Sequence, residues 1–91
     1  VQVNTDALPT SWSRDRIMAE INALGVPCFS GSCSEVYLEK AFDHTPWRPE
    51  TRLEHAKQLG ETSLMFLVHP TLSEHTMQKT CVAIQTVMAE I

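Results

Sequence analysis

Positive charge is scarce in this sequence. Lys and Arg number 7 against 11 for Asp and Glu, and the formal net charge is −4. No stretch of the sequence clusters basic side chains into the patch that binding to nucleic acid or an anionic membrane requires. The composition therefore argues against both kinds of binding. Long apolar runs are lacking too. The longest, Leu64–Val68, is far shorter than the roughly 20 residues that a membrane-spanning helix needs.

Cysteine occurs only as Cys28, Cys33 and Cys81. An odd number in a small chain does not indicate a disulfide framework, and a reducing cytoplasm is the simplest compartment for free thiols. Cys28 and Cys33 are five residues apart, whereas His69 and His75 are six apart, and neither spacing is typical of a zinc site. Nothing in the adjacent sequence supplies an activated thiolate. We therefore predict a cytoplasmic protein with no metal site and no catalytic cysteine.

The length of 91 residues fits a single domain, and an apolar share of 43% is that of a folded protein. The Val-Gln-Val opening is typical of a strand interior. We therefore expect residues 1–91 to be one small domain, a piece of a longer protein.

Apolar spacing and capping residues predict the secondary structure. Ser13 is a helix N-cap, Gly25 and Gly60 are expected to end helices, and the final helix carries an apolar stripe that includes Cys81 as a buried residue. The predicted elements are a strand end at Val1–Val3, a helix over Arg14–Leu24, a short strand at Val26–Phe29, a short helix over Ser34–Ala41, a helix over Arg52–Leu59, a buried strand over Ser63–Val68 and a helix over Ser73–Ile91.

This order of elements predicts an α/β (α+β) fold. We expect a two-layer sandwich, in which helices pack on one face of a small, mostly antiparallel sheet.

The stretch Phe29-Ser30-Gly31-Ser32-Cys33-Ser34-Glu35 is the most informative polar segment. Small hydroxyl residues around a glycine, ahead of a short helix, offer backbone N–H groups to an anion or a polar ligand. The segment is not a P-loop, because no Lys-Ser or Lys-Thr follows it. An ordinary capped turn explains the pattern equally well. His69, next to Pro70, is better explained as the end of a strand than as a catalytic residue.

The order of several motifs resembles a known family. These motifs are Gly25-Val26-Pro27, the run Ser30-Gly31-Ser32-Cys33-Ser34-Glu35-Val36-Tyr37-Leu38-Glu39, the turn Trp47-Arg48-Pro49, and the run Ser63-Leu64-Met65-Phe66-Leu67-Val68-His69-Pro70-Thr71-Leu72. Together they resemble the C-terminal small domain of the DegT/StrS family of nucleotide-sugar aminotransferases, which are pyridoxal-phosphate enzymes of fold type I. The resemblance extends over essentially the whole chain.

The resemblance implies an activity for the whole enzyme. An amino group would move from an amino acid, glutamate in this family, to a nucleotide-linked keto-sugar, in surface-polysaccharide, O-antigen or deoxysugar biosynthesis. The Schiff-base lysine and the pyridoxal 5'-phosphate site would lie in a large domain outside these 91 residues. The chain alone would then be inactive and hold no catalytic or cofactor-binding residue, and the enzyme would be a homodimer.

Relatives carry a His–aromatic pair in the loop after Gly25-Val26, and this sequence has no histidine there. Candidate substrate-binding residues are therefore Ser30, Gly31 and Ser32, together with Glu35 and Tyr37. The alternative function is a non-catalytic α/β module that binds a partner protein or a ligand.

Overall fold

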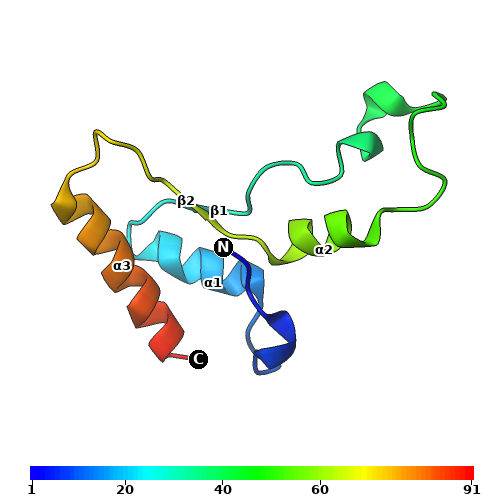
Figure 1. The fold of residues 1–91 in the computed structure, drawn as a ribbon. Coiled ribbons are helices and arrows are strands. Elements are labelled where there is room, and N and C mark those ends of the chain that lie inside the picture. Colours follow the sequence, from blue (N-terminus) through cyan, green and yellow to red (C-terminus); the bar gives the residue numbers. More distant parts are fainter.

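The computed structural model describes residues 1–91 (Figure 1). Its elements are η1 (Thr5–Ala7), α1 (Arg14–Ala23), β1 (Cys28–Phe29), η2 (Val36–Leu38), η3 (Lys40–Phe42), α2 (Glu54–Thr62), β2 (Met65–Phe66) and α3 (Glu74–Ala89). Strands β1 and β2 are antiparallel, with Cys28 opposite Phe66 and Phe29 opposite Met65. The predicted α+β class and antiparallel sheet are confirmed. None of the helices is long and apolar enough to cross a membrane.

Helices α1 and α3 pack together on one face of the sheet and enclose the core. The buried apolar side chains come from both helices and from the sheet, and they are Ile17, Ile21, Val26, Cys28, Leu64, Ala83 and Val87. On the opposite face the cross-strand pair Phe29 and Met65 is exposed, at 45% and 44%. The helices therefore cover one face of the sheet, as predicted, and leave the other apolar face open.

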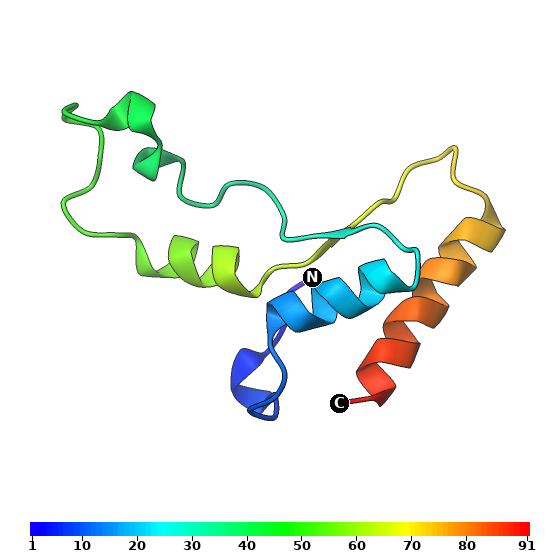
Figure 2. The same ribbon diagram turned by 180° about the vertical axis from the view of Figure 1, so that it is seen from behind.

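The chain divides into a compact body and a projecting arm. We define the body as residues 1–29 and 62–91, and the arm as residues 30–61. Figure 2 shows the arm, with α2 and both of the later 3-10 turns, extending away from α1 and α3. All eight buried residues belong to the body, and the whole chain measures 49 × 37 × 18 Å along its principal axes.

The helix-capping predictions are confirmed at both long helices. The Ser13 hydroxyl accepts a hydrogen bond from the Arg16 N–H (3.1 Å), and the Ser73 hydroxyl accepts one from the Thr76 N–H (3.1 Å). Gly25 has a φ of +80°, the left-handed conformation that glycine adopts readily after a helix. Helix α1 ends within one residue of its predicted boundary.

Gly60 does not end the second helix, so this prediction is wrong. Helix α2 runs through Gly60 to Thr62. A side chain at position 60 would collide with the Ser34 side chain. The glycine is therefore explained by the close approach of the arm's two limbs and not by a helix terminus.

The strand predicted over Ser63–Val68 is shorter and less buried than expected. Only Met65–Phe66 pairs with β1, while Ser63 forms an isolated bridge with Gln2. Val68 is 72% exposed, because no strand or helix of the chain covers that end of the segment.

Two further predictions need correction. The helix expected over Ser34–Ala41 is a pair of separate 3-10 turns, η2 and η3. Cys81 is exposed, although it was expected to be buried. Helix α3 buries Ala83 and Val87 instead, because the small Ala83 side chain allows α3 to pack closely against α1.

Candidate functional site

A cavity with a mixed polar and apolar lining lies between the loop at the start of the arm, helix α2 and the sheet. Its volume is about 490 Å³. It is lined by four serines, two glycines and five apolar residues, namely Ser30, Ser32, Ser34, Ser63, Gly31, Gly60, Val1, Ala56, Leu59, Leu64 and Met65. The predicted candidates Ser30, Gly31 and Ser32 are therefore brought together in one cavity.

Two glycines allow this cavity to form. Gly31 has a φ of +92°, so the loop turns there in a conformation that other residues rarely adopt. A Cβ atom at position 31 would lie 3.8 Å from the Ser63 Cβ, so the loop lies against the sheet. Gly60 lets Ser34 approach α2. The serine-rich loop is thus held along both the sheet and the helix.

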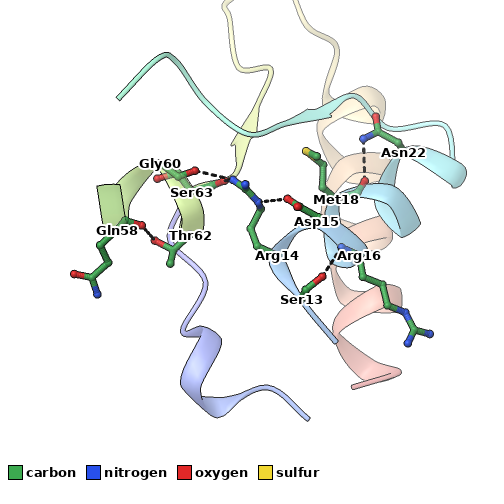
Figure 3. A network of polar contacts seen from close by, with 10 residues as sticks. All are labelled: Ser13, Arg14, Asp15, Arg16, Met18, Asn22, Gln58, Gly60, Thr62 and Ser63. Atoms are coloured by element: carbon green, nitrogen blue, oxygen red, sulfur yellow. Dashed lines mark hydrogen bonds and ion pairs between the residues drawn. The ribbon is translucent and has the colours of Figure 1, made fainter. Parts of the chain in front are cut away.

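Arg14 fixes the helical wall of the cavity (Figure 3). Its Nη1 donates to the Gly60 carbonyl (3.1 Å) and to the Ser63 carbonyl (2.9 Å), and its Nε donates to Asp15 Oδ1 (2.6 Å). The side chain is only 13% exposed. The guanidinium therefore satisfies carbonyls at the C-terminal end of α2 and ties that end to α1.

The role of Arg14 was not predicted, although the sequence contains a signal for it. Arg14 is the first residue of α1, where the helix dipole disfavours a positive charge. Here its guanidinium lies instead against the carbonyl end of α2.

Glu35 and Tyr37 do not line the cavity. Tyr37 Oη donates to Glu35 Oε2 (2.6 Å) and accepts from the Leu53 N–H (2.9 Å), while Arg52 forms a two-point ion pair with Glu35. These contacts join the outgoing limb of the arm, with η2, to the segment that enters α2. The structure therefore assigns both residues to bracing the arm.

The electrostatics of this cluster follow from its contacts. Hydrogen bonds from Arg52 and then from Tyr37 lower the pKa of Glu35 from 4.5 to about 2. Burial, and then the hydrogen bond to the Glu35 carboxylate, raises the pKa of Tyr37. Glu35 is thus an ionised structural partner at neutral pH and a poor general acid.

Arg48 braces the tip of the arm in the same way. Its Nε donates to the Tyr37 carbonyl (2.7 Å) and its Nη2 to the Glu39 carbonyl (3.0 Å), and it forms an ion pair with Asp43 (2.6 Å). The neighbouring Trp47 is 73% exposed. The tip is held by polar contacts, and its largest aromatic side chain is left uncovered.

The cavity contains hydrogen-bonding groups and no acid–base machinery. Its polar side chains are serine hydroxyls, and none of the three lysines, Lys40, Lys57 and Lys79, lines it. No group of three or more His, Cys, Asp or Glu side chains could hold a metal ion. Pyridoxal phosphate needs a Schiff-base lysine and a phosphate site. The residues of this chain do not fit that cofactor, but they can bind a polar ligand.

Comparison with known proteins adds one strong likeness. No protein-family model and no curated protein matches the chain. A solved structure does, namely the X-ray structure of the aminotransferase from Psychrobacter cryohalolentis, with 69% sequence identity and a TM-score of 0.95 over 99% of this chain. That protein is an aminotransferase. The chain spans only 23% of that protein's length.

The two proteins share the fold of this segment throughout. The resemblance to an aminotransferase domain, first indicated by the sequence, is thereby confirmed. The DegT/StrS family, the cofactor and the sugar substrate stay predictions.

Proposed function

We propose that the chain is the C-terminal small domain of a longer, pyridoxal-phosphate-dependent aminotransferase of the DegT/StrS family. The supporting observation is the 69% identity with an aminotransferase over 99% of the chain. The enzyme would transfer an amino group from glutamate to a nucleotide-linked keto-sugar, in surface-polysaccharide, O-antigen or deoxysugar biosynthesis. It would work as a homodimer in the cytoplasm.

The features of the chain favour a role in assisting a catalytic domain rather than in carrying out the reaction itself. Its cavity offers hydroxyl groups but no lysine, so the cofactor would be held by the rest of the enzyme, and the chain alone would be inactive. The exposed apolar pair Phe29 and Met65 lies beside the same cavity. An apolar surface beside a cavity that offers hydroxyl groups is suited to covering an active-site cleft formed by a larger domain.

Within this role, Ser30, Gly31 and Ser32 bind the keto-sugar. Serine hydroxyls and backbone N–H groups match the hydroxyl-rich surface of a sugar, and they would replace the histidine-containing pair of the family. Glu35 and Tyr37 act indirectly, because they brace the arm, and the serine loop is the first part of that arm.

An amino-transfer assay with the full-length enzyme tests the function. Glutamate and pyridoxal phosphate are supplied with candidate nucleotide-linked keto-sugars, and the release of 2-oxoglutarate is measured. We expect release that depends on the keto-sugar. A full-length protein that binds pyridoxal phosphate but accepts no keto-sugar would contradict the substrate class. One that ignores the cofactor would favour the alternative, a non-catalytic binding module.

A further inference from the structure

The serine loop, residues 30–34, is not held in place by its own backbone. These residues belong to no helix or strand, and none of their backbone groups hydrogen-bonds with another backbone group of the chain. Their N–H and C=O groups are therefore available to a ligand. Since backbone pairing does not fix the loop, its position depends on the residues against which it packs.

Two residues at the end of α2 form the wall behind this loop. Ser34 packs so closely on Gly60 that a Cβ atom at position 60 would lie 3.2 Å from the Ser34 Cβ. Gly31 lies within van der Waals reach of the Ser63 Cβ. One contact is near the start of the loop and the other is at its end. Together they determine where the hydroxyl groups between them lie.

A single nitrogen atom holds both residues of this wall. Arg14 Nη1 donates to the Gly60 carbonyl and to the Ser63 carbonyl, and Figure 3 shows the guanidinium reaching from α1 to this end of α2. A positive charge is favourable beside the carbonyl end of a helix. Because the side chain is largely shielded from water, these bonds are stronger than on an open surface. A shift of either carbonyl would break a bond to a charged donor.

Arg14 extends from a rigid element of the body. It is the first residue of α1, and the Ile17 and Ile21 side chains of that helix are 0% and 1% exposed. Binding groups keep their geometry only when rigid neighbours support them. The packed core of the body thus reaches the loop of the arm through one side chain.

We infer that Arg14 is a positioning residue for the keto-sugar. It fixes the carbonyls of Gly60 and Ser63, these two residues fix the serine loop, and the loop presents its hydroxyl and N–H groups to the sugar. The inference rests on the proposed function. Arg14 does not line the cavity, so its effect passes through the wall and the loop.

Kinetics of the full-length enzyme separate this role from general damage. Arg14→Ala should lower kcat/KM for the keto-sugar by about fivefold, mainly through a higher KM, because misplaced groups bind the sugar less well. The release of 2-oxoglutarate from glutamate in a single turnover without sugar should keep its rate within about twofold, since the sugar takes no part in it. Arg14→Lys should recover part of the KM, because an ammonium keeps the charge but lacks the planar, two-way donor.

Two variants control for lost charge and for lost stability. Arg16→Ala removes another arginine of α1, whose Nη1 donates to the Ser11 carbonyl (2.7 Å) and which does not line the cavity. Val87→Ala removes packing at a core position that is also absent from the cavity lining, and it lowers stability as Arg14→Ala does. Both controls should keep the wild-type KM for the keto-sugar. An equal rise of KM in Val87→Ala would show that lost stability is the cause, and would overturn the inference.

A double-mutant cycle tests the route through the loop. In a protein that already carries Ser30→Ala and Ser32→Ala, the further change Arg14→Ala should alter kcat/KM by less than about twofold, because the hydroxyl groups that Arg14 positions are gone. If the full fivefold loss persists in this background, Arg14 acts by another route and the inference is overturned.

A nitroxide label on Cys33, an exposed residue of the loop, gives a readout that does not use activity. The other exposed cysteines, Cys81 among them, are replaced by Ser. Electron paramagnetic resonance spectra should show a more mobile label in Arg14→Ala and the wild-type line shape in Arg16→Ala and Val87→Ala. An active enzyme whose line shape or KM does not respond to Arg14→Ala would overturn this inference alone. A more mobile label in a protein that accepts no keto-sugar would count against the proposed function alone, since Arg14 would still hold the loop.

Discussion

The body and the arm are stabilised by different forces. The body contains every buried residue, whereas the arm contains none and is held by hydrogen bonds and ion pairs of Glu35, Arg48 and Arg52. Burial of an apolar side chain stabilises a fold by roughly 1.5–3 kcal/mol. An exposed ion pair contributes at most about 1 kcal/mol. Apolar burial therefore stabilises mainly the body, and polar contacts stabilise the arm.

The cavity lies where these two regions meet. Its serine loop begins the arm, its Ser63 and Met65 belong to the body, and Arg14 reaches from the body to the end of α2. Substitutions in the body, at the junction and in the arm are therefore expected to have progressively smaller effects, from loss of the fold to local changes in the arm.

The largest effect is expected in the core of the body. Val87→Asp would place a charge where the native side chain is 2% exposed, and an unpaired buried charge costs about 3–5 kcal/mol. Chemical denaturation followed by circular dichroism measures the loss. Cys81→Asp, on an exposed position of the same helix, is the matched control and should change stability by less than about 0.5 kcal/mol. Equal effects would mean that the register of α3 is wrong.

A smaller loss of stability is expected at the junction. Arg14→Ala removes two hydrogen bonds from a charged donor to the carbonyls of Gly60 and Ser63, and bonds to charged groups contribute about 1.5–3 kcal/mol. Arg14→Lys should recover part of this loss, since it keeps the charge. Denaturation midpoints of the three proteins give the result, and wild-type stability in Arg14→Ala would show that the junction does not depend on this side chain.

The cavity should affect catalysis more than folding. The double variant Ser30→Ala, Ser32→Ala in the full-length enzyme should lower kcat/KM for the keto-sugar by about tenfold, which corresponds to one or two neutral hydrogen bonds of about 1 kcal/mol each. Steady-state kinetics provide the measurement. Ser11→Ala, in an exposed position remote from the cavity, is the control. If both variants retain wild-type kinetics, the serine loop does not contact the substrate.

The smallest effect is local to the arm and depends on pH. Glu35 has its pKa lowered to about 2, so its ion pair is fully formed above its ordinary pKa of 4.5 and is lost as the pH falls from 4.5 through 2. Carbon-13 NMR of the Glu35 carboxyl group should show a midpoint near 2. Arg52→Ala should move that midpoint up toward 4.5, because Arg52 is the main cause of the shift. A wild-type midpoint near 4.5 would refute the ion pair.

The sequence predicts the body better than the arm, for physical reasons. Helix α1 was found because its apolar spacing and its Ser13 and Gly25 caps all agree. The burial of α3 was predicted only in part, because the partly buried Ile84 packs against the core as its spacing suggests, whereas Cys81 is exposed and the most buried positions are Ala83 and Val87.

In the arm and the cavity, the decisive contacts join residues far apart in the chain. Gly60 accommodates Ser34, and Glu35 pairs with Arg52. No local pattern encodes such pairs, so the end of α2 was misplaced and the pairing of Glu35 with Arg52 was not predicted. Ser30, Gly31 and Ser32 are contiguous, so their placement in one cavity could be expected from the sequence, whereas their contact with a substrate stays a prediction.

The absorption spectrum of the full-length protein is the most direct test of the central claim. Spectra are recorded with pyridoxal phosphate, before and after glutamate is added, and in parallel for residues 1–91 alone. We predict a visible band from lysine-bound cofactor in the full-length protein, its loss on addition of glutamate, and no such band for residues 1–91. A full-length protein without the band, or a band formed by residues 1–91 alone, would contradict the assignment of this chain as the cofactor-free domain of an aminotransferase.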